Sequence, residues 1–503
     1  MKKGKVWLCL VLAALMVFAT ACSSNNGSNT ETPTNTSEAA NNPEPKEEPY
    51  EIVLGYPVLG EVPADIDAVE AEINKITLEK INATVKLSRI TIGQWFQQKN
   101  LILAGNEKMD LILTDFQSYS PAVAKNQFLA QDELLEQYGQ GIKEIHSESL
   151  EVARINGKIF ATPVKSFAEG GTAVLMRKDL LDKHGIEVSD IQGTQGLDKV
   201  FETIKKNEPE MTVFAVPNSP KPMTGLIDGL YVDTLTDGLG VLPMNSSEMK
   251  VVNLYEMPEY VEALKQLRSW YVAGYFPKDA ANSKANATDL VKSGSAFSVF
   301  EGNSVFIEDT ISSATGFEMV KVVTEKPLLS TQAMIGLSWA IPQNAQNPQK
   351  AMEFLNLTFT DQDIINLINF GIEGKHYTKK SDNVIALIPD GGYRMNQGFM
   401  FGNRLLTYVL DGENPALREE NVKFAESLPR SPAVGFLPST DAVNTEVVAV
   451  MGVLEQYRKA LETGNVDPEK IHPDFVAKLK AAGIDTIIAA KQEQLDAWLA
   501  QQK

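Results

Sequence analysis

Cysteine is nearly absent from this sequence. The chain has 2 cysteines in 503 residues, and both lie close to the N-terminus, at Cys9 and Cys22. From residue 23 onward there is therefore no thiol. This excludes disulfides, thiolate metal sites and a cysteine nucleophile from the main body of the chain.

Histidine is also scarce. The chain has 4 histidines, at His146, His184, His376 and His472. They are far apart and form no His-x-x-x-His pair, so the spacing predicts no zinc or redox-metal centre and leaves only a structural Ca²⁺ undecided. The sequence also has no Gly-x-Ser-x-Gly nucleophile elbow and no phosphate-binding loop. We therefore expect no cofactor and find no motif for catalysis.

Basic residues are outnumbered by acidic ones. Lysine and arginine total 46 against 65 aspartate and glutamate residues, which gives a formal net charge of −19. An acidic surface repels nucleic-acid phosphates and anionic lipid headgroups. We therefore expect no nucleic-acid partner and no polybasic patch to hold the protein on a membrane.

The apolar run at the N-terminus, residues 6–18, is too short to span a bilayer. It follows Lys2, Lys3 and Lys5 and leads through Ala19-Thr20-Ala21 into Cys22. This order is typical of an export signal, and the cysteine makes it a lipoprotein signal, although bacterial lipoproteins usually have leucine in place of Ala19. We expect residues 1–21 to be removed and Cys22 to carry fatty acids such as palmitate. The protein would then be anchored at the extracellular face of the cell membrane. The alternative is an ordinary signal peptide with a chance cysteine.

A polar segment, residues 22–49, follows the signal. It consists mainly of Ser, Asn, Thr, Glu and Pro, with no large apolar residue before Tyr50. Such a composition cannot bury enough surface to offset chain entropy. We expect a disordered linker with a reach of roughly 30 Å.

From residue 50 the chain alternates apolar runs with amphipathic segments. Residues 52–54 and 111–113 read as strands, and helical spacing recurs between them, which predicts a parallel β-α-β-α-β start. A second α/β run begins near Gly170, after a connection at residues 162–171. The two α/β runs predict two lobes joined by this connection. The apolar run 334–341 predicts a late strand, with which the chain returns to the first of these lobes. Chains that cross between lobes more than once form a hinge.

Several long stretches resemble one family. They are MIGLSWAIPQNAQNPQKAMEFLNLTFTD at 334–361, NFGIEGKHY at 369–377, GFMFGNRLLTYVLDGENP at 398–415, SPAVGFLPSTDAVNTEVVAV at 431–450 and KAAGIDTIIAAKQEQLDAWL at 480–499. They resemble the family-1 extracellular solute-binding lipoproteins of ABC importers, in the sugar-binding branch of Gram-positive bacteria. The resemblance implies a two-lobe, periplasmic-binding-protein-like α/β fold of type II with a multi-strand hinge. It implies a first lobe at 50–165 with 334–380 and a second at 166–333 with 381–503.

The resemblance also implies a function without a chemical step. A monomer would capture an extracellular carbohydrate, such as an oligosaccharide, between its lobes and deliver it to membrane permease subunits. Three alternatives remain open at this point: ligand presentation to a membrane sensor kinase, a peptide ligand, and a glycoside hydrolase that uses Asp115 and Glu301 as its carboxylate pair.

Sugar sites place aromatic rings beside carboxylates or amides, because rings cover C–H faces and planar polar groups bind hydroxyls. The candidate ligand-binding residues with this chemistry are Tyr56, Asp115, Phe116, Glu301, Asn303, Trp339, Glu373, Tyr377, Phe399 and Phe436. Structural roles compete with this interpretation: a helix cap for Asp115, a glycine turn around Glu373, and packing for the aromatic rings. The carboxylates favour a neutral ligand, whereas Lys375, Arg394 and Arg404 leave a uronic acid possible.

Overall fold

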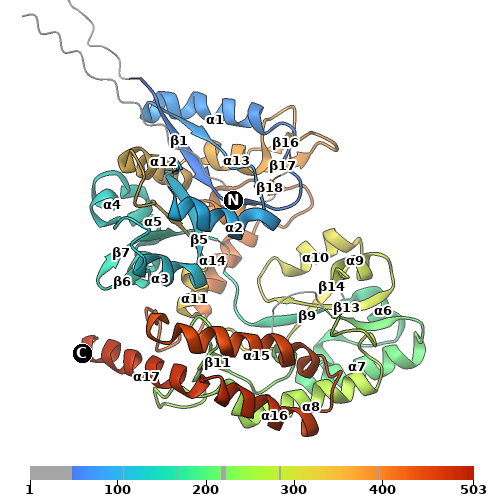
Figure 1. Cartoon of the computed structure of the whole chain (residues 1–503). Helices are drawn as coiled ribbons and strands as arrows, with labels where there is room; N and C mark the ends of the chain where they lie inside the picture. The colour runs from blue at the N-terminus through green and yellow to red at the C-terminus, as the bar shows by residue number, and fades with distance from the viewer. Residues whose placement is uncertain are drawn as a thin grey trace, which may run out of the picture. The chain divides into compact units, whose positions relative to one another are not determined.

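The computed structural model describes residues 48–105, 107–166, 168–216, 223–282, 285–393, 395 and 397–502. The predicted signal, Cys22 and nearly all of the predicted linker lie outside the described residues. Within the described ranges, no helix has the length and apolar character needed to cross a membrane. The described body contains two mixed sheets with separate cores (Figure 1). We call them the first lobe and the second lobe.

Five strands form the sheet of the first lobe, in the order β3-β1-β5-β15-β8. Their bounds are β1 Tyr50–Gly55, β3 Ala83–Lys86, β5 Leu111–Asp115, β8 Ala161–Pro163 and β15 Leu337–Ala340. β1 is parallel to β3 and β5, while β15 is antiparallel to β5 and places Trp339 opposite Leu113. The predicted parallel start and the predicted late strand of the first lobe are both confirmed.

The helices of the first lobe follow the apolar periodicity of the sequence. They are α1 Ile66–Ile81, α2 Ile92–Ala104, α3 Phe116–Ala124, α4 Asp132–Tyr138, α5 Gln140–Val152, α12 Pro348–Thr360 and α13 Gln362–Phe370. In α1, the helically spaced Ile66, Val69 and Ile73 are buried, and the helix ends where Asn82 adopts a left-handed conformation at φ 46°. α12 begins behind Asn347, whose side chain accepts a hydrogen bond from a backbone N–H of its first turn.

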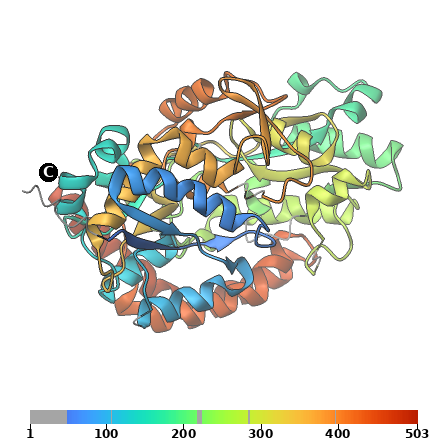
Figure 2. The same cartoon turned by 90° about the horizontal axis from the view of Figure 1, so that it is seen from above.

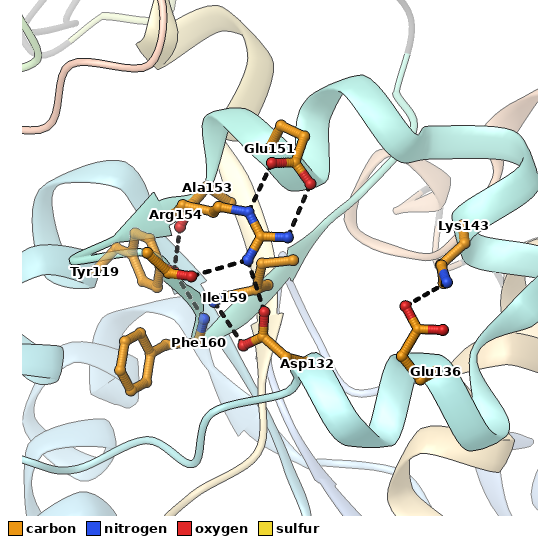
Figure 3. A network of polar contacts seen from close by, with 10 residues as sticks. Tyr119, Asp132, Glu136, Lys143, Glu151, Ala153, Arg154, Ile159 and Phe160 are labelled. Atoms are coloured by element: carbon orange, nitrogen blue, oxygen red, sulfur yellow. Dashed lines mark hydrogen bonds and ion pairs between the residues drawn. The ribbon is translucent and has the colours of Figure 1, made fainter. Parts of the chain in front are cut away.

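A polar network fixes the chain where it approaches β8 (Figure 3). The guanidinium of Arg154 forms an ion pair with Asp132 at 2.6 Å. The Tyr119 hydroxyl donates to the Ala153 carbonyl at 2.7 Å and accepts the Phe160 N–H at 3.0 Å. Because Phe160 directly precedes β8, the network holds the strand from which the chain leaves the first lobe.

Four strands form the sheet of the second lobe, in the order β10-β13-β9-β14. Their bounds are β9 Thr172–Arg177, β10 Thr212–Ala215, β13 Ala296–Gly302 and β14 Met319–Val323. The helices around it are α6 Lys178–Lys183, α7 Gly193–Asn207, α8 Pro258–Val272, α9 Ala287–Lys292 and α10 Ile307–Thr315. β10 is parallel to β13, whereas β9 is antiparallel to both of its neighbours. The second α/β run predicted from the sequence is confirmed.

The C-terminal helices build a further core against α8. They are α15 Asn444–Glu462, α16 Pro468–Ala481 and α17 Ile484–Gln501. Tyr255 and Tyr260 pack there against Phe475 of α16 and Leu454 of α15.

Seen from above, α1 and β1 of the first lobe lie nearest the viewer and the red C-terminal helices lie farther away (Figure 2).

Three stretches connect the lobes, which confirms more than one crossing. They are residues 164–171 between β8 and β9, residues 324–336 between β14 and β15, and residues 411–432 after the strand β18, Val409–Leu410. The second contains α11 Thr331–Ile335 and the third contains α14 Leu417–Ser427. A β-bridge joins Leu329 of the second stretch to Arg430 of the third. Adjacent crossing stretches of this kind form a hinge.

The remaining strands are short. They are β2 Pro57–Val58, β4 Ile90–Thr91, β6 Arg154–Ile155, β7 Lys158–Ile159, β11 Val232–Asp233, β12 Leu242–Pro243, β16 Tyr377–Ser381, β17 Val384–Leu387 and β18 Val409–Leu410. The last three pair with one another. Residues between and after them, including Tyr393, Met395 and Phe401, belong to the core of the first lobe. This core therefore includes residues beyond position 380, where the resemblance placed the lobe boundary.

A buried carboxyl joins α15 to α8. Glu462 accepts hydrogen bonds from the Met223 N–H and the Tyr260 hydroxyl, both at 3.2 Å. Burial raises the pKa of Glu462 from 4.5 to about 7, against the opposing effects of Arg458 and the two hydrogen bonds. The folded state therefore binds a proton at Glu462 more tightly than the unfolded state does.

We expect this proton to make stability depend on pH. The raised pKa contributes stability that is fully present below pH 4.5 and is lost as the pH rises through about 7. Relative to Glu462→Gln, whose amide does not titrate, the wild-type free energy of unfolding should fall by up to about 3 kcal/mol between pH 4.5 and pH 8. Urea unfolding of both proteins at the two pH values measures this difference. A difference that is the same at both pH values would contradict the assignment.

Candidate functional site

A cavity of about 460 Å³ lies at the crossing stretches and is lined from both lobes. The first lobe contributes Phe116, Leu337 and Phe399, and the second lobe contributes Val232, Asp233 and Thr234. The crossing stretches contribute Val164, Gly171 and Glu325. Ser330, Gln332, Ala333 and Met334, at or in α11, complete much of the wall. Its volume is within the range of about 300–1,000 Å³ that is typical of ligand pockets.

The end of β5 positions the first aromatic ring. Asp115 caps α3 by accepting the Ser118 N–H at 2.9 Å, and it also accepts Lys99 Nζ at 3.1 Å. Burial alone would raise the pKa of Asp115. The charge of Lys99 and the hydrogen bonds from Ser118 and Lys99 lower it by more, so the pKa lies below its usual value. The Phe116 N–H donates to the Gly336 carbonyl at 3.2 Å. Asp115 thus holds the turn that presents Phe116 to the cavity.

Two carboxyl groups reach the cavity next to β11 and β14, Asp233 from the second lobe and Glu325 from the second crossing stretch. Asp233 is 3% exposed and accepts the Leu235 N–H at 2.9 Å. Glu325 is half-buried, and burial raises its pKa despite a hydrogen bond from Thr172. The oxygen atoms of both side chains can accept hydrogen bonds from the hydroxyl groups of a ligand.

The backbone around these carboxyls is constrained. Gly171 has φ 71°, and a Cβ at this position would lie 2.2 Å from the Glu325 carbonyl oxygen. Leu235 and Thr236, directly after the cavity-lining Thr234, have φ values of 47° and 79°. Such values are unfavourable for residues other than glycine and concentrate at functional sites. The close packing at Gly171 and the strained turn after Asp233 set the shape of this wall.

The cavity is acidic. Among the residues that the structure describes, Glu169, Asp233 and Glu325 line it, against one lysine, Lys326. Lys326 also lies 5.7 Å from the centre of the Tyr231 ring. The charge balance disfavours an anionic ligand.

Two of the ten candidate residues, Phe116 and Phe399, line this cavity. Two others lie in the adjoining core. Tyr56 and Trp339 are at most 1% exposed and pack against Phe401, at ring-centre distances of 4.9 and 5.4 Å. The Trp339 indole N–H donates to the Met400 carbonyl at 2.7 Å. These two rings therefore support the wall from which Phe399 extends.

The second-lobe candidates Glu301, Asn303 and Phe436 do not line this cavity. Asn303 is 4% exposed and donates its amide hydrogen to the Gly170 carbonyl at 3.0 Å. Gly170 lines the cavity. Glu301 is a half-buried residue near the end of β13. Phe436 is buried against the Trp498 ring, with 6.0 Å between ring centres.

The remaining candidates belong to the β16–β17 region. Glu373 is half exposed and pairs with Lys379 at 3.3 Å. Tyr377 is 6% exposed and contacts the Tyr408 ring at 5.9 Å. Lys375, named for a uronic acid, forms an ion pair with Asp65 at 2.8 Å. Of the other two cationic candidates, Arg394 lies outside the described residues and Arg404 is absent from the cavity wall.

The sequence reasoning missed the polar residues at these strand ends. Asp233 is the last residue of the two-residue strand β11, Thr234 follows it, and Glu325 follows β14, where neither helical nor alternating periodicity marks a residue. Within the described ranges, no three His, Cys, Asp or Glu side chains are close enough together to hold a metal ion.

Known proteins match this chain over most of its length. A family model described as bacterial extracellular solute-binding protein matches residues 74–370, and one described as a domain of unknown function (DUF3502) matches residues 432–500. A carbohydrate ABC transporter substrate-binding protein of Streptococcus pneumoniae serotype 4 is 29% identical over 461 residues, which cover 88% of this chain and 90% of that protein.

The solved structures of one pneumococcal protein are similar as well. The N-glycan transport solute binding protein NgtS of Streptococcus pneumoniae is 25% identical, with a TM-score of 0.79 over 91% of this chain and 100% of that chain. Its complex with Man1GlcNAc is 26% identical, with a TM-score of 0.74 over 90% and 99% of the chains. Its complex with Man5GlcNAc is 26% identical, with a TM-score of 0.72 over 91% and 100%.

Proposed function

Because the chain belongs to the bacterial extracellular solute-binding proteins, we propose that it captures a neutral oligosaccharide between its lobes for an ABC importer. The observation that carries this proposal is the cavity itself, which is lined from both lobes. The pneumococcal relatives support the ligand class, since one is a carbohydrate ABC transporter substrate-binding protein and NgtS was solved with two glycans.

The chemistry of the cavity matches a sugar. Phe116 and Phe399 offer apolar faces for C–H groups, and Asp233 and Glu325 offer oxygen atoms for hydroxyls. Ser330 and Gln332 add neutral donors and acceptors. Three carboxyls against one lysine favour a neutral glycan over a uronic acid.

Closure of the lobes supplies the mechanism. A ligand that touches both lobes favours the closed state, because only closure completes its contacts. We propose residues 50–163 and 337–410 for the first lobe and residues 172–323 and 433–502 for the second. The three crossing stretches lie between them. A permease that recognises the closed outline then receives the ligand, and no bond is made or broken.

The proposed carboxylate pair of a hydrolase has little support. Asp115 is engaged by Lys99 and Ser118, and it caps α3. Neither Asp115 nor Glu301 lines the cavity. We therefore propose a binding protein without enzymatic activity.

We also propose that Cys22 carries a lipid anchor. The order of lysines, apolar run, small residues and cysteine supports it. The family name places the protein outside the cell, and the polar linker would hold the described body away from the headgroups.

Calorimetric titration tests the function. We expect Man5GlcNAc to give a saturable heat of binding, and a uronic-acid oligosaccharide of similar length to bind at least about tenfold more weakly because the cavity is acidic. Chromatography after long incubation should recover the glycan unchanged. A protein that binds no saccharide would contradict the proposed ligand class, and cleaved glycan would contradict the absence of catalysis.

A further inference from the structure

A second cavity of about 510 Å³ lies beside the first, between α5 and α14. Five residues line both cavities: Val164, Ser166, Glu169, Ala333 and Met334. They belong to the first two crossing stretches. The two cavities therefore adjoin along the hinge, and each one alone is in the size range of a ligand pocket.

Two residues of the second cavity carry buried polar atoms without a partner. Asn421 Nδ2 and His146 Nε2 have no hydrogen-bond partner among the residues that the structure describes. Asn421 is 3% exposed, and its Oδ1 accepts a hydrogen bond from the Ala168 N–H at 3.4 Å. Its amide nitrogen is therefore the atom that still has donors to offer. Buried polar atoms are nearly always paired in folded proteins. These two atoms point to an occupant that supplies hydrogen bonds.

The state of His146 narrows the chemistry of this occupant. α5 is kinked at His146, with φ −140° and ψ 22°. Burial and the nearby Lys165 lower the pKa of His146 to about 3, so the imidazole is neutral at physiological pH. A neutral imidazole has one donor and one acceptor nitrogen, and an amide nitrogen is a donor. A hydroxyl group, which both donates and accepts, fits such neighbours.

The charges around the second cavity argue against an anion. Arg430 forms an ion pair with Glu148, and Lys165 donates to the Ile145 carbonyl at 3.2 Å. Glu169 and Glu426 add negative charge to the wall. Both cationic side chains of the wall thus already bind protein groups, and the charged side chains that remain, Glu169 and Glu426, are acidic.

Apolar residues provide much of the remaining surface. Among them are Ile145, Leu329, Met334, Leu405, Ala425 and Leu428. A cavity with apolar walls and a few buried hydrogen-bonding groups suits the C–H faces and hydroxyls of a sugar ring.

We propose that the second cavity is a carbohydrate subsite, which takes a terminal sugar of a branched oligosaccharide whose other sugars occupy the first cavity. Asn421 and His146 bind its hydroxyl groups. The subsite rests on the proposed function. It makes a distinct prediction, because it concerns large glycans and leaves the binding of small ones unchanged.

Glycans of two sizes test the subsite. The wild type and two variants are titrated with Man5GlcNAc and with Man1GlcNAc. Asn421→Leu removes the amide group at similar side-chain volume. Ala425→Trp places an aromatic ring in the second cavity. Lys423→Ala and Lys423→Trp are matched controls, because Lys423 is an exposed residue of the same helix and does not line the cavity. Melting temperatures verify that each variant is folded.

We expect Asn421→Leu to weaken Man5GlcNAc binding about tenfold and Ala425→Trp to weaken it more, with Man1GlcNAc affinity unchanged within twofold. The control variants should bind both glycans like the wild type. Equal losses for both glycans, or no loss for Man5GlcNAc in either folded variant, would overturn the subsite and indicate a cavity that holds only water. A wild type that binds neither glycan would instead contradict the proposed function.

Discussion

Replacing Trp339 with alanine should lower the free energy of unfolding by about 3–5 kcal/mol, as is usual for a large buried aromatic residue. Trp339 is 1% exposed, and its ring lies 6.2 Å from the Tyr56 ring and 5.4 Å from the Phe401 ring. The substitution also leaves the Met400 carbonyl without its indole donor. Because the ring does not line the first cavity, we expect the glycan affinity of the folded variant to stay within a few-fold of the wild type.

Two further variants separate packing from ligand contact. Trp339→Phe keeps most of the apolar volume and loses the hydrogen bond, so it should cost about 1–3 kcal/mol. Trp498→Ala is a control in the second lobe, where the ring is partly exposed, and it should cost less than Trp339→Ala. Urea unfolding and calorimetry measure the two properties separately. An affinity loss above tenfold at unchanged stability would show instead that Trp339 contacts the sugar.

Several elements of the first lobe were predictable because local signals in the sequence mark them. The apolar run 111–113, the helical spacing of Ile66, Val69 and Ile73, and the late apolar run each set one element. The parallel connections then limited the topology. The extent of the first core was less accessible, because Tyr393, Met395 and Phe401 stand in irregular chain after short strands. Their burial depends on tertiary contacts that no local pattern records.

The site was predictable where a strand end defines it. The rule that ligands bind beyond the carboxyl ends of strands drew attention to Tyr56 and Asp115. Phe116, the neighbour of Asp115, lines the cavity, whereas Tyr56 is buried in the core. For an aromatic residue in an apolar run, the sequence does not show whether the ring packs in the core or lines a cavity. Trp339 and Phe116 both adjoin apolar strand residues, yet one ring packs in the core and the other lines the cavity. The carboxyl groups of Asp233, in the two-residue strand β11, and of Glu325, after β14, could be found only from the folded chain.

Removing both cavity rings should have the largest effect on binding. Phe116 and Phe399 are partly exposed and pack at the edge of the first core, so Phe116→Ala and Phe399→Ala should each weaken glycan binding about tenfold, or about 1.4 kcal/mol. Stability should change less than in Trp339→Ala, since both residues are only partly buried, whereas Trp339 is 1% exposed. Phe96→Ala is the matched control, because Phe96 is 60% exposed and does not line the cavity.

The double variant shows whether the two rings contact the same sugar. If Phe116 and Phe399 stack on different rings of the glycan, the losses add and Phe116→Ala with Phe399→Ala binds about 100-fold more weakly. If they enclose one ring, the first substitution already frees that ring to move, and the double variant loses less than the sum. Calorimetry of the four proteins with Man5GlcNAc gives this coupling directly. If the double variant binds the glycan with wild-type affinity, the first cavity is not the ligand site, because no other aromatic side chain of the described residues lines this cavity.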